Sequence, residues 1–404
     1  MIPINAAYGG IWTLLPLYLL ELGGSVIDVG FAGTVFNLAV IPGSLVWGYL
    51  ADAYPRRRTV MHAATVVIAT VIAAKFLTSS IPILVLLYAM YGFLSTAYTP
   101  TTQLLIMEFT LKRDWAQEFG RMSSASSLGF VLGVAPGVIW TRYLPLNTYL
   151  VYCLILQLIA LALIRKIREP QRTIEREAIT FSLDAFVSRI RELPLFFLKV
   201  PRKSDFVRFH RMAGLGLTQT LPLLFIAMTL FFSGASMFFT SFTPFLKSRD
   251  VPDFEVFVVY LLLFASNTIS FRYAGKIAQK FAPSRVTSLS MLIRGLTLLS
   301  AYSLTLLSTS TQVIIASLLI LTVVGASFTL ANTASSVIIY HNLEPGRKGE
   351  LLGIYSALTG IGLLSGAFVS GFVSYHLAYG ITFLIAGAVV LGSLVMFKRA
   401  AAQG

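Results

Sequence analysis

Few side chains in this sequence have the chemistry of a catalytic or metal site. The four histidines, His62, His210, His341 and His376, are scattered, and Cys153 is the single cysteine. They form no metal-ligand spacing, no disulfide within the chain and no pairing of a nucleophile with a base. We therefore expect no enzymatic activity, no metal and no cofactor.

Neutral polar and aromatic side chains within long apolar segments are stronger candidates for a site. Hydroxyls and amides can bind a neutral or mildly polar solute without the desolvation cost of a charged group. The same groups can instead bond one another between helices in a membrane. The candidates for lining a solute cavity are Tyr8, Trp12, Asn37, Tyr98, Thr99, Gln103, Ser233, Asn267 and Asn332.

Acidic residues avoid the middle of these apolar segments. Glu21, Asp28 and Glu108 stand at segment ends, and no Asp or Glu lies further inside. A carboxylate within the membrane is the usual proton carrier, and its cost means that it is retained mainly for function. The sequence therefore favours transport that does not depend on protons.

The apolar segments themselves predict an all-α integral membrane protein. The 404 residues are 56% hydrophobic and 12% charged, with a mean hydropathy of +0.79. About 20 mostly apolar residues are needed for a helix to cross a bilayer. We predict twelve transmembrane helices, over residues 3–22, 29–51, 60–77, 82–108, 119–140, 146–164, 216–246, 254–274, 286–307, 313–340, 351–375 and 377–397.

The two halves of the chain repeat the same landmarks in the same order. Gly129 and Gly133 recur as Gly362 and Gly366. Two related halves that face each other are a recurrent way to build a transporter, because the cleft between them can open to either side. We expect two pseudo-symmetric six-helix bundles over residues 1–164 and 214–397, a linker with a basic amphipathic helix over 165–213, and a tail over 398–404.

The positions of the basic residues behind the net charge of +14 indicate how the chain is oriented in the membrane. All but five of the 31 Lys and Arg fall at links or tails on one predicted side of the membrane. Because Lys and Arg collect on the cytoplasmic side, we expect a cell-membrane protein with both termini cytoplasmic. Its partners are then the bilayer and a small-molecule substrate, with no nucleic acid, and we expect a monomer. The five exceptions are Lys75, Arg142, Lys247, Arg249 and Arg294.

The link after the second segment carries the most specific pattern. It contains Gly48, Asp52, Arg56, Arg57 and Arg58, and a degenerate copy begins at Gly275. This pattern resembles the signature loop of the major facilitator superfamily, and the resemblance extends over the whole chain. Ala53 replaces a usual basic residue, and Pro55 stands where glycine is common. The resemblance implies the major facilitator fold, with two bundles that rock about a central site.

The resemblance also implies a cytoplasmic latch. Asp52 would contact the start of the eleventh segment, near residues 350–352, when the cytoplasmic side is closed, since a carboxylate is stabilised by a helix N-terminus or an arginine. Gly48 permits close helix approach. Glu108 and Arg121 could pair across a neighbouring link. The alternative is that Asp52 and the arginines only fix topology.

Two further expectations come from the same resemblance. Gly129, Gly133 and Pro136 resemble the Gly/Pro motif of antiporters in this family, although close helix packing alone explains glycines spaced by four. The ninth helix lies on the outside of the bundle in this fold. We therefore expect Arg294 to snorkel or to pair locally rather than to meet the solute.

Together these features predict a secondary active or facilitative transporter. It would move a small neutral or amphipathic organic solute by alternating access. One alternative is a proton- or ion-coupled multidrug-type efflux antiporter. An alternative of another class is a non-transporting membrane receptor or sensor on the same fold, which would be expected to add a soluble signalling domain.

Overall fold

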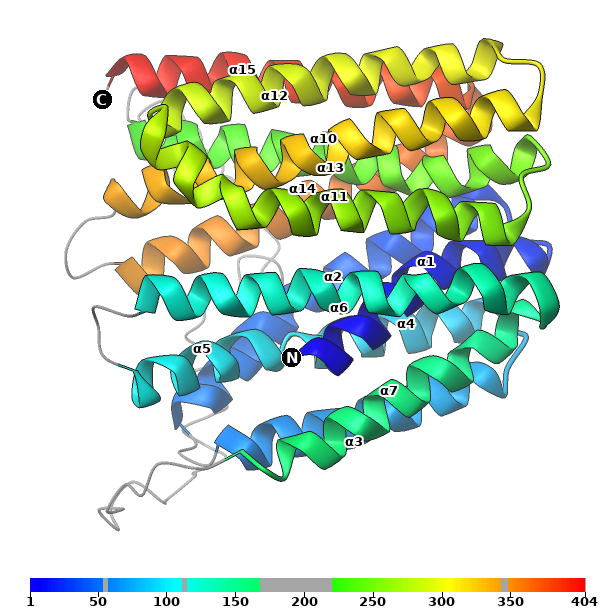
Figure 1. Cartoon of the computed structure of the whole chain (residues 1–404), viewed down its shortest axis with the longest axis horizontal. Coiled ribbons are helices and arrows are strands. Elements are labelled where there is room, and N and C mark those ends of the chain that lie inside the picture. The colour runs from blue at the N-terminus through cyan, green and yellow to red at the C-terminus, as the bar shows by residue number, and fades with distance from the viewer. Residues whose placement is uncertain (54–56, 111–114, 168–219, 343–347, 404) are drawn as a thin grey trace, which may run out of the picture.

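A computed structural model describes residues 1–53, 57–110, 115–167, 220–342 and 348–403, and these form an all-helical protein (Figure 1). The helices of the first half are α1 (Ile2–Glu21), α2 (Val26–Ala53), α3 (Arg57–Phe76), α4 (Ile81–Ser95), α5 (Tyr98–Phe109), α6 (Trp115–Tyr143) and α7 (Tyr149–Ile164). Those of the second half are α10 (Thr220–Ser248), α11 (Asp253–Lys280), α12 (Pro283–Ser300), α13 (Ser310–His341), α14 (Lys348–His376) and α15 (Tyr379–Gln403).

The twelve predicted segments correspond to these helices, with one correction. The fourth segment was expected as one helix, but it is divided into α4 and α5 at Thr96 and Ala97. At this break, the hydroxyl of Ser95 donates to the carbonyl of Gly92 at 2.9 Å, and that of Thr96 donates to the carbonyl of Phe93 at 2.7 Å. Such bonds compete with the regular helical pattern.

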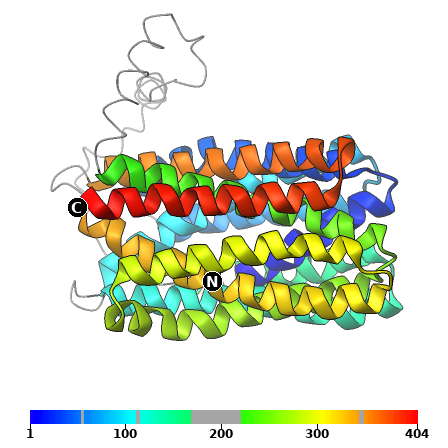
Figure 2. The ribbon, with the colours of Figure 1, turned by 90° about the horizontal axis from the view of Figure 1, so that it is seen from above.

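Length and apolar composition fit the helices to a bilayer. In the described part of the chain, ten stretches are long and apolar enough to cross a membrane, and α4 is a shorter apolar helix. The helices run nearly parallel to the long axis of the molecule (Figure 2). The predicted amphipathic helix of the linker lies outside the described residues.

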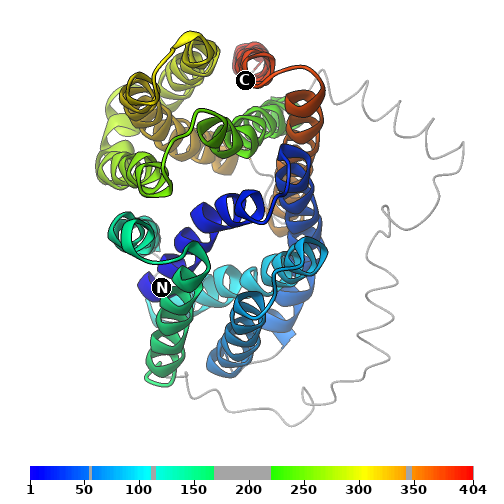
Figure 3. The ribbon, with the colours of Figure 1, turned by 90° about the vertical axis from the view of Figure 1, so that its right-hand side faces the viewer.

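The helices form two bundles that lie side by side (Figure 3). One bundle contains α1 to α7 and the other contains α10 to α15. Across the interface, α2 packs against α14 and α6 packs against α11. These two pairings are related by the repeat, because α2 and α11 occupy the same position in their halves, as do α6 and α14.

The repeated glycines pack equivalent helices in each bundle. A Cβ at Gly133 of α6 would collide with the backbone of Ala6 in α1. A Cβ at Gly366 of α14 would collide with the carbonyl of Ser233 in α10. Gly129 and Gly362 make the same kind of approach, to Asn5 and Thr229. Each glycine pair therefore fixes the fifth helix of its half against the first.

The bundles are in close contact at one end of the molecule, which we call the α1–α2 end because it carries the link between those helices. There Gly30 of α2 faces Gly371 of α14, and the ring of Tyr149 lies 5.2 Å from that of Phe257. At the opposite α2–α3 end, a Cβ added at Gly48 or at its counterpart in α11, Gly275, would meet no described neighbour within 4 Å. The structure is therefore closed at the α1–α2 end.

Candidate solute cavity

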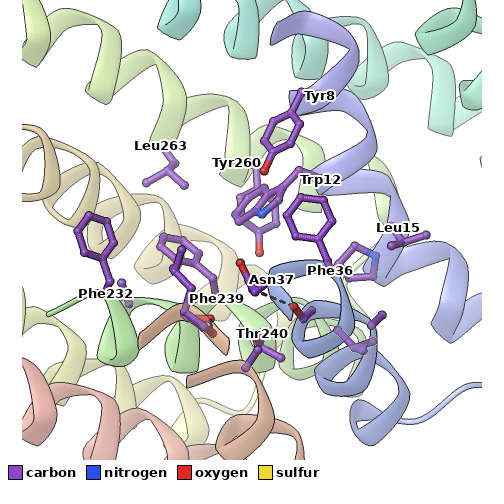
Figure 4. A pocket seen from close by; sticks show the side chains of 18 of the residues that line it. Tyr8, Trp12, Leu15, Phe36, Asn37, Phe232, Phe239, Thr240, Tyr260 and Leu263 are labelled. Carbon is purple, nitrogen blue, oxygen red and sulfur yellow. Dashed lines mark hydrogen bonds between the residues drawn. The ribbon is translucent and has the colours of Figure 1, made fainter. Parts of the chain in front are cut away.

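A cavity of about 330 Å³ lies between the two bundles (Figure 4). Its walls come mainly from α1 and α2 on one side and from α10 and α11 on the other. Single residues of α4, α6 and α12 and pairs from α13 and α14 complete it. A cavity shared by both bundles changes shape whenever they rock, which is the geometry that alternating access requires.

Aromatic side chains form much of the cavity wall. The indole of Trp12 meets the ring of Tyr260 edge-on at 5.2 Å, and Phe36 stacks on Tyr88 at 4.4 Å. Rings of this kind bind apolar and planar solutes by contact area and edge or face interactions. The aromatic lining residues are Tyr8, Trp12, Phe36, Tyr88, Phe130, Phe232, Phe239, Tyr260, Phe264 and Phe328.

Two amides place hydrogen-bonding groups in this aromatic wall. Asn37 donates from Nδ2 to the carbonyl of Gly33 at 2.8 Å, and Asn267 accepts at Oδ1 from Thr329 at 3.2 Å. Within the described chain, the Oδ1 of Asn37 and the Nδ2 of Asn267 have no hydrogen-bond partner. The cavity therefore offers one spare acceptor from the first bundle and one spare donor from the second.

Four of the expected cavity residues line the cavity, and most of the others have different surroundings. Tyr8, Trp12, Asn37 and Asn267 are in the wall. Tyr98 is buried inside the first bundle, where its hydroxyl contacts Thr65 at 3.0 Å and Gln157 at 2.6 Å. These bonds satisfy the hydroxyl between helices, and Tyr98 is not among the residues that line this cavity.

Ser233, Thr99 and Asn332 also lie outside the cavity lining. The hydroxyl of Ser233 contacts that of Ser365 at 3.3 Å, so it joins α10 to α14. Thr99 is exposed on α5, and Asn332 is half-buried on α13. The side chain of Gln103 lies outside the described residues. Ser236 and Thr240, which follow Ser233 on α10, line the cavity instead.

The structure places part of the expected latch. Arg57 is buried, and Arg58 donates to the carbonyl of Arg165 at 3.5 Å. Arg121 forms an ion pair with Glu118 on its own helix at 2.6 Å. Arg56 and the side chains of Asp52 and Glu108 lie outside the described residues, so the latch and the pairing of Glu108 with Arg121 stay predictions.

Arg294 was expected to snorkel or to pair locally rather than to meet the solute, and the structure shows a local bond together with a place in the cavity wall. It is 1% exposed and lines the cavity. Its Nη1 donates to the carbonyl of Val324 on α13 at 2.7 Å. In the described chain α12 packs mainly against α13 and α15, at the edge of the bundle. A long arginine side chain can nevertheless reach past α13 to the cavity.

Lys75 is a second buried cation that the sequence analysis did not assign to a site. It is fully buried in α3, and its Nζ has no hydrogen-bond partner in the described chain. The Nζ lies 4.8 Å from the ring centroids of both Tyr88 and Tyr91. Because Tyr88 lines the cavity, Lys75 stands directly behind its wall. One feature of the sequence could have identified Lys75: it is one of the five basic residues that do not lie on the predicted cytoplasmic side.

Comparisons with known proteins agree with this architecture. The sequence model described as Major Facilitator Superfamily matches residues 3–340. A crystal structure of a mutant of the nucleoside transporter NupG is 15% identical, with a TM-score of 0.74 over 99% of this chain and 97% of that one. The xylose transporter XylE from E. coli, partially occluded and inward-open, is 13% identical, with a TM-score of 0.70 over 98% and 95%. No curated protein matches the chain by sequence.

Proposed function

Because the chain belongs to the major facilitator superfamily, we propose that it carries a small amphipathic organic solute through the cavity between its bundles. The family model covers most of the chain, and the chain is therefore a secondary transporter. The single observation that carries this proposal is the composition of the cavity wall. Its aromatic rings suit an apolar solute body, and its few amides and hydroxyls suit one or two polar groups.

Alternating access fits the way in which the bundles meet. Contacts between them close the α1–α2 end, while at the α2–α3 end a Cβ at Gly48 or Gly275 would meet none of the described residues within 4 Å. Rocking would break the first set of contacts and bring Gly48 and Asp52 toward the start of α14, which begins at Lys348. The proposed latch then stabilises the second state, since an aspartate is favourable at a helix N-terminus.

We favour a facilitator over a proton-coupled antiporter. Among the residues that line the described cavity there is no carboxylate. Gly129 and Gly133 pack α6 against α1, so they supply no separate reason for antiport. The positive-inside pattern further supports a chain in the cell membrane with cytoplasmic termini. We propose that it acts as a monomer and without nucleic acid.

Uptake into proteoliposomes tests the proposal. The panel would contain nucleosides, pentoses and aromatic carboxylates with their amides, and the expected result is protein-dependent, saturable flux of at least one solute. In the variant Gly33→Trp, the indole would fill the cavity beside Ala367 and Thr240, so flux should be lost. Gly392→Trp is the matched control, because a Cβ there meets no described neighbour within 4 Å and Gly392 does not line the cavity. Equal flux in protein-free vesicles would refute the proposal.

A further inference from the structure

Arg294 brings a positive charge to the cavity that the described protein does not neutralise. The side chain is almost fully buried, and its Nη1 uses one donor on the carbonyl of Val324. Among the described residues, its Nε has no hydrogen-bond partner and its guanidinium forms no ion pair. Arg294 therefore retains a full charge and unused donors beside a solute-sized space.

The neighbouring rings hold the guanidinium in place without removing its charge. The guanidinium carbon lies 5.2 Å from the ring centroids of both Phe231 and Phe328, which stack at 6.2 Å with 9° between their planes. Cation–π contact partly offsets the loss of hydration. A buried cation without an anion is nevertheless costly, and such residues within a membrane usually mark a solute pathway.

The rest of the wall indicates what kind of anion would bind. Val324 accepts only from Nη1, which leaves Nε and Nη2 as the side of the guanidinium that can bind a carboxylate in two parallel hydrogen bonds. The Nε is covered in this state, so the second of these bonds needs it to be uncovered when the solute binds. On the rest of the wall, Trp12, Phe239 and Phe264 present rings to the body of a solute. A small inorganic anion would leave this aromatic surface unfilled, whereas an organic acid would use both features.

We propose that the transported solute is an organic carboxylate with an aromatic or other apolar body, and that Arg294 binds its carboxylate. This inference rests on the proposed transport function and names its substrate class. Arg294 then determines specificity by charge, because a neutral analogue of the same shape leaves the guanidinium unpaired. The amides of Asn37 and Asn267 orient the body of the solute.

Matched pairs of ligands test the inference on the purified full-length protein. The probes are benzoate with benzamide, 1-naphthoate with 1-naphthamide, and indole-3-acetate with indole-3-acetamide, titrated by calorimetry at neutral pH. In the wild-type protein, at least one carboxylate should bind about tenfold or more tightly than its amide, as expected for charge-assisted hydrogen bonds.

Substitutions then assign the preference to this residue. Arg294→Gln should abolish the preference for the carboxylate, and Arg294→Lys, which keeps the charge but loses the planar fork, should keep part of it. Arg272→Gln is the matched control, since Arg272 is an exposed arginine on α11. If Arg294→Gln does not fold, the wild-type pairs and Arg294→Lys still decide the question.

Each outcome has a defined meaning. Equal binding of acids and amides, or the absence of carboxylate binding, would overturn the inference. A preference that survives Arg294→Gln would overturn it as well. In that case, uptake of neutral solutes that Gly33→Trp blocks would leave the transporter proposal intact. The absence of any protein-dependent uptake by the wild-type protein would refute the transporter proposal itself.

Discussion

Gly30→Ala should open the α1–α2 end of the protein. The added Cβ would lie 2.7 Å from the Cα of Gly371 and 3.0 Å from the carbonyl oxygen of Ala367. Favourable contacts between heavy atoms are about 3.5–4.0 Å. Both neighbours are backbone atoms of α14, so no rotamer change relieves the collision, and α2 and α14 must separate.

The size of the effect follows from this collision. Forcing one extra methyl group into a well-packed contact costs about 1–3 kcal/mol. The cost applies only while the α1–α2 end is closed, so it shifts the equilibrium between the two states by roughly 5- to 150-fold. The gain in helix propensity, about 1 kcal/mol, applies to both states and does not shift the equilibrium.

Cysteine accessibility measures this shift. The reporter is Thr240→Cys in a Cys153→Ala background, because Thr240 lines the cavity and lies near Gly33 and Ala367. A membrane-impermeant maleimide added on the side of the α1–α2 end should label the Gly30→Ala variant at least about fivefold faster than its parent.

Gly392→Ala is the control for this experiment. It makes the same change within a helix, but its Cβ meets no neighbour within 4 Å. It should therefore label at the parental rate. If Gly30→Ala also labels at the parental rate, the contact between α2 and α14 does not hold this end closed, and the two-state reasoning is wrong.

Three further predictions concern the latch, energy coupling and stability. Asp52→Asn should favour the state that is open at the α2–α3 end by about tenfold or more, and unchanged maleimide labelling at that end would show that Asp52 is not a latch. Uptake should be insensitive to an imposed pH step, whereas acceleration that Glu108→Gln abolishes would favour the antiporter. Ser374→Ala removes hydroxyl contacts to Ser241 and Thr382 at 2.6 and 2.7 Å and should cost about 0.6 kcal/mol, at most about 1.7. Thermal unfolding measures this loss, and the exposed Ser303→Ala is the control, which should leave the midpoint unchanged.

The sequence alone was sufficient to predict where the helices lie and that they form two halves. Hydropathy located them because each bilayer crossing needs a long apolar run, and spacing identified Gly129 and Gly133 as a pair that recurs. It missed the break between α4 and α5, since Thr96 and Ala97 leave the apolar run uninterrupted. Local bonds of serine and threonine hydroxyls do not appear in a hydropathy average.

The cavity lining was harder to predict because the rotation of a helix about its axis is set by packing. Ser233 and Ser236 lie close together on α10, yet only Ser236 reaches the cavity. Tyr98 is polar within an apolar segment, as Tyr8 is, but it satisfies its hydroxyl between helices. The place of Arg294 in the cavity wall was not expected for a related reason, since the position of a helix in a bundle does not limit how far a long side chain reaches.

The unneutralised arginine in a cavity wall without described carboxylates has an electrical consequence. The charge of Arg294 stays with the protein during rocking, so each cycle with a bound carboxylate would move one negative charge across the membrane. Moving that charge against the membrane potential costs about 2.3 kcal/mol per 100 mV. With the cell interior negative and no accompanying ion, the potential would at equilibrium hold the carboxylate roughly 50-fold more concentrated outside than inside per 100 mV. Such a carrier would work as an exporter, driven by voltage rather than by a proton gradient.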